Sequence, residues 1–528
     1  MQPSTTSPPC FRFLVAGPLS SRPTGRRGRL LLADLAERLS QAPLSLQKDV
    51  GPALGAAGSL TIKAEFSRFR DFSVAEVIGR GLGELHRLAG RLIAPSGRPR
   101  SDDFLATIAR IAGRGPLHAE LSACFAPPPP PPTDHSGGDL VDELLARATN
   151  QRSAASAAID ALVRGSVTTT PAGVAVEPAR AAHACLTAAL ARAARAVLDD
   201  PVVRAAEIRW RALRLFLGQC PKDHELAVEH LDVAAADLPA ALAELGDLDP
   251  LARPDVVFLI DPVDSLTATA ALAEVGADLH TPIVAELAPA ALGAATTAEL
   301  LAREDGLGGA WDELRREPAT RWLALAVNGP VLAAETTAVG ERVVTGGGAL
   351  AVAALLATSL RTGGTFAQLG RDADFRAPAT RSIRHGQEDI PIGTADACVV
   401  ERQLALARAG LLALGGPLQS DLVTLAACPI VHASEDATTL PGQLLVGRTV
   451  RFALWVRERI PAGAGAEEVS DFVTRAAALM LLPGTPIRPR FGAALQQGEQ
   501  GPELKIAASY PPALSGAPVA LSFALPLR

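Results

Sequence analysis

Apolar positions recur along most of the chain in two patterns that predict alternating strands and helices. Short apolar or alternating runs predict strands, and apolar residues three or four positions apart predict helices. The expected strands are 11–16, 60–66, 226–233, 256–260, 282–287, 322–327, 503–509 and 519–527. The expected helices are 73–92, 102–111, one from Leu140, 177–198, 202–217, 264–279, 297–303, 348–361, 440–460 and 467–482.

The order of these elements predicts a mixed α/β fold. Residues 256–287 read as strand, helix and strand, and a helix of this length between two strands is typical of a parallel pair with a right-handed crossover. Local signals support two helix starts: Ser73 with Glu76 three residues later, and Asp200 before Pro201. No repeat of solenoid or propeller period is present in the sequence. We therefore expect mixed sheets flanked by helices.

Six consecutive prolines, Pro127–Pro132, predict a boundary within the chain. Such a run favours an extended polyproline II conformation, and the Ser/Gly-rich residues 133–138 favour a flexible end. This divides the chain into a part of residues 1–126, a linker of 127–139 and a part of 140–528. A ligand for an SH3 or WW domain is the alternative, but the run has no flanking basic residues, so a spacer is favoured.

Composition excludes several partner classes. The chain has 528 residues, of which 48% are hydrophobic, and its 50 basic and 56 acidic residues give a net charge of -6. This balance disfavours nucleic acid and anionic membranes as partners. The longest apolar helical run, 349–360, falls short of the ~20 residues that span a membrane, so no membrane insertion is expected. The six cysteines show no metal-binding or paired spacing, which predicts buried free thiols and a cytoplasmic location.

Two segments suggest nucleotide chemistry, and neither is complete. Residues 256–261 resemble a Walker B strand whose Asp261 would hold Mg²⁺, but the phosphate loop that must accompany it is missing from the sequence. Asp261 followed by Pro262 is more simply the end of a buried strand. Residues 345–348, Thr-Gly-Gly-Gly, precede a helix and could present backbone N–H groups to an anion. A glycine entry into a tightly packed helix is favoured.

The remaining polar residues give no catalytic or metal-binding pattern. The nine histidines form no His-Glu-x-x-His motif, and the sequence has no Gly-x-Ser-x-Gly nucleophile turn. We therefore expect no catalytic residues, no cofactor and no metal.

The part before the prolines carries three features in order: the strand 11–16, the turn Gly17-Pro18-Leu19-Ser20-Ser21-Arg22-Pro23, and the strand 60–66 that leads to Asp71-Phe72-Ser73. By these features it resembles TssB, the small sheath protein (VipA) of type VI secretion systems.

The part after the prolines contains eight segments that match a known family: 207–213 around Trp210, the strand 227–233, His280–Val284, Trp311–Glu317, Arg321–Leu325, Ile390–Thr394, Glu401–Leu411 and Arg451–Ile460. By these segments, which occur in the family's order across nearly the whole chain, it resembles TssC, the large sheath protein (VipB). The TssC stretch Gly-Gly-Glu-Pro-Tyr-Gly is missing between Leu245 and Asp255.

The double resemblance implies a TssB–TssC fusion with a contractile tail-sheath fold. Such a chain would be one sheath protomer, not an enzyme, polymerising with copies of itself around an Hcp-like inner tube. The sheath would join a baseplate and contract to expel the tube. Two alternatives stay open: a sheath-derived scaffold that does not contract, and a soluble α/β enzyme.

Two segments are expected to carry contacts. The strand 519–527 places Val519, Leu521, Phe523, Leu525 and Leu527 on one face, and at the end of the chain it could add to a neighbour's sheet. The resemblance also implies that a recycling ATPase of the ClpV type, an AAA+ protein, could dock at the helix that begins with Leu140, Val141, Leu144 and Leu145.

Overall fold

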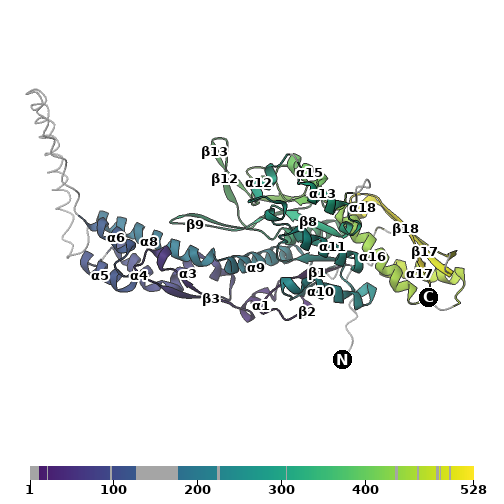
Figure 1. Ribbon diagram of the computed structural model, residues 1–528, viewed down its shortest axis with the longest axis horizontal. Helices are drawn as coiled ribbons and strands as arrows, with labels where there is room; N and C mark the ends of the chain where they lie inside the picture. Colours follow the sequence, from purple (N-terminus) through teal and green to yellow (C-terminus); the bar gives the residue numbers. More distant parts are fainter. Residues whose placement is uncertain are drawn as a thin grey trace, which may run out of the picture.

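A computed structural model describes the protein over residues 11–20, 22–95, 98–126, 176–222, 226–304, 306–433, 438–460, 463–482, 487, 489–498 and 501–527. The molecule is elongated (Figure 1). A helical arm lies at one end, a sheet with its covering helices lies in the middle, and a smaller C-terminal sheet lies at the other end. The predicted linker and the predicted helix from Leu140 fall outside the described residues.

The central sheet combines strands from both parts of the chain. It has seven strands in the order β14-β8-β7-β6-β1-β5-β2, and all are parallel except β2, which pairs antiparallel with β5. Strand β1 lies between β5 and β6. The strands are β1 Phe11–Ala16, β2 Arg27–Arg29, β5 Leu226–Leu231, β6 Val256–Leu259, β7 Ile283–Glu286, β8 Leu323–Val327 and β14 Leu411–Ala413.

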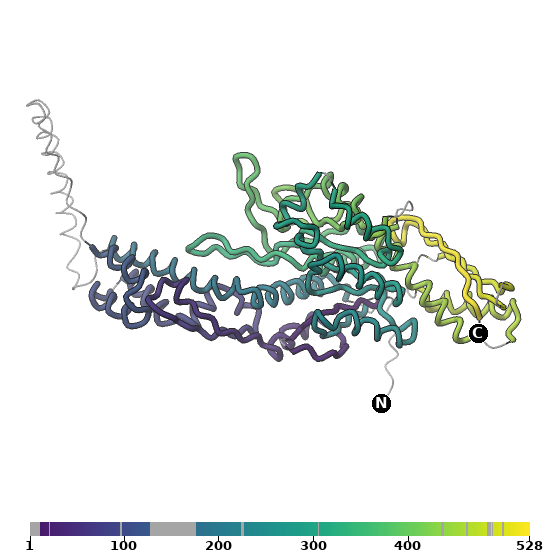
Figure 2. The backbone as a smooth tube through the Cα atoms, viewed as in Figure 1, coloured from purple at the N-terminus to yellow at the C-terminus, as the bar shows by residue number. Residues whose placement is uncertain are grey.

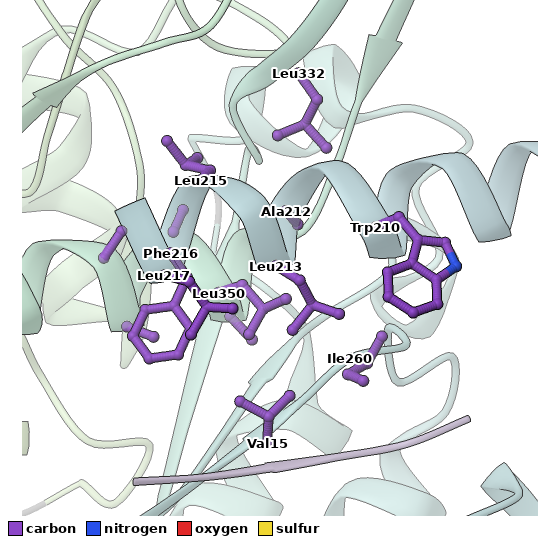
Figure 3. Packing of buried hydrophobic residues seen from close by; sticks show 14 of the residues in the cluster. Val15, Trp210, Ala212, Leu213, Leu215, Phe216, Leu217, Ile260, Leu332 and Leu350 are labelled. Atoms are coloured by element: carbon purple, nitrogen blue, oxygen red, sulfur yellow. The ribbon is translucent and has the colours of Figure 1, made fainter. Parts of the chain in front are cut away.

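Strand β1 is buried on both faces because helices cover the two sides of the sheet. Phe13 and Val15 lie in the same core as helices α9 (Pro201–Gln219) and α14 (Gly348–Gly363). Leu14 and Ala16 lie in the second core with α11 (Leu266–Leu279). Figure 3 shows the first core, where Leu213 and Phe216 of α9 lie close to Val15. A strand buried on both faces needs a continuous apolar run, which explains the sequence of β1.

The arm also mixes the two parts of the chain (Figure 2). Helix α8 comes from the large part and packs against α2, α3, α4 and α6 of the small part. The elements of this end are β3 Leu44–Asp49, α2 Gly51–Leu54, β4 Thr61–Phe66, α3 Val74–Gly81, α4 Gly83–Ile93, α5 Ser101–Ala112, α6 Pro116–Phe125 and α8 Val176–Leu198. Helix α1, Leu35–Gln41, lies beside β2 of the central sheet instead.

Hairpins and short helices surround the central sheet, and a three-stranded antiparallel sheet, β16-β17-β18, packs on α16 and α17 at the C-terminal end. The surrounding elements are α10 Leu238–Ala243, α12 Thr297–Ala302, α13 Gly309–Arg316, β9 Val331–Thr337, β10 Gly340–Thr345, β11 Asp374–Arg376, β12 Arg381–His385, β13 Glu388–Ile392, α15 Val400–Arg408 and β15 Leu422–Thr424. The C-terminal elements are α16 Leu440–Arg457, α17 Ala466–Met480, β16 Arg490–Gly498, β17 Gly501–Tyr510, α18 Pro512–Ser515 and β18 Val519–Pro526.

A buried ion pair joins α16 to the central sheet. Asp255, just before β6, accepts from Arg451 at 2.5 Å and from Arg448 at 2.9 Å. The backbone N–H of Arg12 donates to the same carboxylate. Burial lowers the pKa of Arg451 to about 10, although Asp255 opposes this shift. The guanidinium therefore stays charged at neutral pH, and the two parts of the chain meet at this carboxylate.

The mixed α/β class is confirmed, and most predicted elements lie within a few residues of their expected bounds. The helix expected over 73–92 is wrong as a single element, because the chain breaks at Leu82 between Gly81 and Gly83. Glycine weakens a helix, and a Cβ at Gly81 would come within 3.0 Å of Ile62. The two predicted caps are confirmed: Ser73 accepts from the backbone of Glu76, and Asp200 accepts from that of Val202.

The expectation of buried thiols is only partly right. Cys398 and Cys428 are buried, and burial raises the pKa of each thiol to about 12. Cys124, Cys185 and Cys220 are half-buried. All five described cysteines are free thiols.

Candidate functional site

The turn after β1 is held closed by a carboxylate from the large part of the chain. Asp232 is buried just beyond β5, and its oxygens accept from the backbone N–H of Leu19 at 2.8 Å and of Thr24 at 3.1 Å. The hydroxyls of Ser20 and Thr24 donate to the same carboxylate. This turn carries the motif of residues 17–23, so the motif and Asp232 together fix β1 in the shared sheet. Both segments, the turn 17–23 and the strand that leads to Asp232, are visible in the sequence, but the sequence does not show that they are in contact.

The second motif of the small part closes a tight turn. Asp71 is buried and accepts from the backbone N–H groups of Ser67 at 2.9 Å and Arg68 at 2.8 Å, and it pairs with Arg80 at 2.7 Å. Burial alone would raise the pKa of Asp71, but these donors together lower it. Ser73 then caps α3, so residues 71–73 serve to start a helix.

The hairpin β9–β10 ties α3 to the large part. Glu335 of β9 accepts from the backbone N–H of Val74, the first residue of α3, at 3.0 Å. Arg342 of β10 is buried and pairs with the buried Glu207 of α9 at 2.5 Å. A carboxylate at a helix N-terminus is favourable, and a buried guanidinium needs such a partner. The hairpin therefore links the arm to the central body.

His230 makes a pH-sensitive contact beside the edge strand β2. It lies on β5, is buried, and its Nε2 is 3.2 Å from a guanidinium nitrogen of Arg38 in α1. Arg38 can only donate, so the imidazole accepts and must be neutral. Burial, and secondarily Arg38, lowers the pKa of His230 below its ordinary value of 6.5.

We expect acid to destabilise the protein through this contact. Because the folded state disfavours the protonated imidazole, the contribution of His230 to stability is complete above pH 6.5 and is lost as the pH falls from 6.5 towards the lowered pKa. Thermal unfolding followed by circular dichroism should give a midpoint that falls with pH in this range. In a His230→Gln variant the fall should be smaller, and an unchanged slope would contradict this role.

A pocket lies at the carboxyl ends of the parallel strands, where α/β proteins commonly bind ligands. It has a volume of about 380 Å³ and is lined by α9, by the segments after β6, β7 and β8, and by α12. Asp261 reaches it but pairs with Arg209 at 3.1 Å. The lining is mainly apolar and includes two carboxyl groups, those of Asp261 and Glu286. The carboxylate of the Walker B resemblance, Asp261, is thus already paired with a guanidinium.

The Thr-Gly-Gly-Gly segment holds a carboxyl group that belongs to the chain itself. Glu286 of β7 accepts from the backbone N–H of Gly348 at 2.9 Å, the first residue of α14. Burial raises the pKa of Glu286, while the N–H groups of Gly348 and Gly347 oppose this. Gly347 has a φ of 70°, and a Cβ there would lie 2.5 Å from the Cβ of Ala212. The glycines therefore permit close packing of α14 on α9, which was the favoured interpretation.

We expect the purified chain to hydrolyse no nucleotide. Asp261 is paired with Arg209, and the N-terminus of α14 is already satisfied by Glu286. The measurement is phosphate release from ATP and Mg²⁺ by the wild-type chain and by an Asp261→Ala variant. Turnover that persists after removal of contaminating ATPases and disappears in the variant would favour the enzyme alternative.

The described residues form neither a metal-binding group nor a membrane-spanning helix. Among the described residues, no group of three or more His, Cys, Asp or Glu side chains is placed to hold a metal ion. Within the same residues, no helix has both the length and the apolar character needed to cross a bilayer.

The expected contact strand lies at the edge of the C-terminal sheet. β18 pairs antiparallel with β17 over eight residues, from Tyr510↔Val519 to Glu503↔Pro526. The predicted face is present: five apolar side chains pack against the main core, namely Val519, Leu521, Phe523, Leu525 and Leu527. In the described chain no strand pairs with the other edge of β18. The structure thus leaves an open edge there, and whether a neighbour uses it stays a prediction.

The ATPase-docking residues Leu140, Val141, Leu144 and Leu145 lie outside the described residues. That expectation therefore also stays a prediction.

No protein-family model matches the chain, and no curated protein matches it. Solved structures are similar to part of it. A chain of the contracted helical sheath of the anti-feeding prophage (AFP) has a TM-score of 0.32 and 16% identity, covering 55% of this chain and 72% of that one. A chain of the six-fold symmetrised AFP baseplate has a TM-score of 0.31 and 16% identity, covering 55% and 70%. The sheath tail protein from Desulfitobacterium hafniense has a TM-score of 0.32 and 12% identity, covering 56% and 60%.

Proposed function

We propose that the chain is a structural subunit of a contractile sheath, and more specifically a TssB–TssC fusion of a type VI secretion system. The observation that carries the proposal is the position of β1. The small part supplies a strand to the interior of the large part's sheet, between β5 and β6, so both parts are needed for one folded protomer. This is the arrangement expected if two sheath proteins have been joined into one chain.

The residues of the family resemblance support this proposal by their contacts. The turn 17–23 meets Asp232, the Asp71 turn starts α3, and Trp210 is buried in the core. Each of these residues holds the fold together, and none forms part of a catalytic group. Structural contacts of this kind are what a structural subunit requires.

Polymerisation would use edges and surfaces that a single copy leaves open. The free edge of β18 can receive a strand from a neighbour, which would link one protomer to the next through main-chain hydrogen bonds. The proposed partners are further copies of the chain, an Hcp-like inner tube, a baseplate and, for recycling, a ClpV-type ATPase. The proposed location is the cytoplasm, and neither nucleic acid nor membrane insertion is part of this function.

Electron microscopy of the purified chain tests the proposal directly. We expect hollow tubes, and with the inner-tube protein present we expect extended and contracted forms that differ in length and diameter. Tubes of a single form under all conditions would favour the non-contractile scaffold. A chain that stays monomeric at every concentration, with and without an inner tube, would contradict the sheath proposal.

A further inference from the structure

The pocket beside α9 lies where the helices change from one face of the central sheet to the other. Helices α11, α12 and α13, which follow β6 and β7 in the chain, pack in the core on one face of the sheet. Helix α14, which follows β8 by way of the hairpin β9–β10, packs with α9 in the core on the other face. The chain therefore leaves β7 and β8 towards opposite faces, and such a switch point forms a crevice in which α/β proteins commonly bind a ligand.

Apolar side chains from both cores form the walls of this pocket. They are Ile208, Ile260, Leu287, Leu300 and Val327, and all of them except Ile208 are buried. The volume of about 380 Å³ suits a small molecule, and sites for small molecules are mostly apolar, with a few polar groups that orient the ligand. The body of a suitable ligand is therefore aliphatic.

The two guanidinium groups of the lining do not select an anion. Arg209 pairs with Asp261 at 3.1 Å, and its remaining Nε is fully enclosed, so a ligand in the pocket does not reach it. The side chain of Arg204 is 40% exposed and lies 4.0 Å from Asp199, so water and a carboxylate both weaken its charge. An ion would lose its hydration here without gaining a strong partner, which is costly. A neutral ligand is therefore favoured.

Glu286 supplies a polar group that a neutral ligand can use. Of the two carboxyl groups in the lining, only that of Glu286 has no ion-pair partner among the described residues, and it accepts from the backbone N–H of Gly348 at 2.9 Å. Burial raises the pKa of Glu286 and so favours its neutral form, which can both donate and accept. The bond from Gly348 leaves part of this capacity unused, and a hydroxyl or amide group can fill it.

We propose that this pocket binds a small neutral molecule with an aliphatic body and a hydroxyl or primary amide end that hydrogen-bonds to Glu286. The apolar walls hold the body of the ligand, and the carboxyl group orients its polar end. This binding goes beyond the proposed sheath function and does not depend on it, because every group that lines the pocket belongs to one copy of the chain.

Three ligands with the same carbon chain test the preference for a neutral end. Hexan-1-ol, hexanoate and hexylammonium differ only in their polar group, and ligand-observed NMR titration measures their binding to the full chain. We expect saturable binding of hexan-1-ol, and binding about tenfold weaker or more for both ions, since burying a charge without a strong partner is costly. Absence of saturable hexan-1-ol binding, or binding of either ion as tight as that of the alcohol, would overturn the proposal.

Substitutions show whether the alcohol lies in this pocket. Ala205→Trp adds a large side chain at an exposed position of α9 that lines the pocket, so it should abolish binding. The matched control is Ala243→Trp, at an exposed position of α10 outside the pocket, which should leave binding unchanged. Circular dichroism checks that each variant is folded. Unchanged binding of hexan-1-ol to the folded Ala205→Trp variant would overturn the proposal.

The role of Glu286 is tested by two further variants. Glu286→Gln keeps a neutral group that donates and accepts, so its affinity for hexan-1-ol should stay within about threefold of that of the wild type. Glu286→Met removes the hydrogen bond and should weaken binding about tenfold. Equal affinities of the folded Gln and Met variants would overturn the assigned hydrogen bond. If neither variant folds, the result with Ala205→Trp and the comparison of the three ligands still decide the proposal.

Discussion

A proline at Ser522 should abolish tube formation and leave the protomer folded. The backbone N–H of Leu527 donates to Pro502 on β17. Because backbone groups alternate sides along a strand, residues 519, 521, 523 and 525 also bond towards β17, whereas 520, 522 and 524 direct theirs to the open edge. Proline at Ser522 therefore removes a donor that only an incoming strand would use. The chain already has Pro526 at an edge-facing position of this strand.

The control for this prediction is Ser522→Ala, which keeps the N–H and should form tubes as the wild type does. Phe523→Pro should behave differently, because it removes a bond to β17 and a side chain packed on the core, and it should lower the thermal midpoint. Tubes are scored by negative-stain microscopy and folding by circular dichroism. Normal tubes from Ser522→Pro would mean that β18 only completes its own sheet.

Deleting residues 519–528 is a less specific test of the same strand. The apolar face of β18 packs on the core, and eight residues of β17 pair with it. Deletion would therefore expose part of the core of the protomer, and it would also remove the strand edge to which a neighbouring protomer is proposed to bind. Loss of tubes together with loss of stability would not separate these effects, whereas the edge proline changes one backbone group.

The periodicity of the sequence predicted five of the seven strands of the central sheet, missing the short strands β2 and β14, and it did not predict the order of the strands. The apolar run of β1 shows that the strand is buried, and the βαβ pattern of 256–287 correctly predicts that β6 and β7 are parallel neighbours. That β1 lies between β5 and β6 depends on pairings more than 200 residues apart in sequence. Local pattern carries no information about such partners, since any fully buried strand would show the same run.

Polar hairpins and buried carboxylates were the main features that periodicity missed. The hairpins β9–β10 and β12–β13 extend from the body and have charged, partly exposed strands, so they lack an alternating apolar signal. Asp232 and Asp255 each bind several donors from distant segments, yet each is a single acidic residue beside a strand in the sequence. Their roles arise only when the fold brings the donors together. For the candidate contact strand, the alternation of 519–527 predicted which five side chains share a face, but not that this face packs on the chain's own core.

The chain cut within its proline run should still form one complex. We expect residues 1–126 and 133–528, expressed together, to copurify in equal amounts, because β1 places five buried side chains into two cores. Burying each of the four larger ones, Phe11, Phe13, Leu14 and Val15, contributes about 1.5–3 kcal/mol. Residues 133–528 alone should aggregate, since β5 and β6 would each expose an unpaired edge in the middle of the sheet. Replacing Pro127–Pro132 by a Gly/Ser linker of equal length should leave the intact chain unchanged.

Substitutions in the small piece show whether β1 is responsible for the association. Phe13 is fully buried, and its ring lies 5.3 Å from that of Phe258 and 6.5 Å from that of Phe216. Phe13→Asp should therefore prevent copurification, whereas Lys63→Asp on the exposed face of β4 should not. Because a tether raises the local concentration of its two ends to the order of mM, the fused chain should tolerate Phe13→Ala better than the two pieces do. Two pieces that fold separately and do not bind would contradict the single-protomer proposal and, with it, the role of the polyproline segment as a passive spacer.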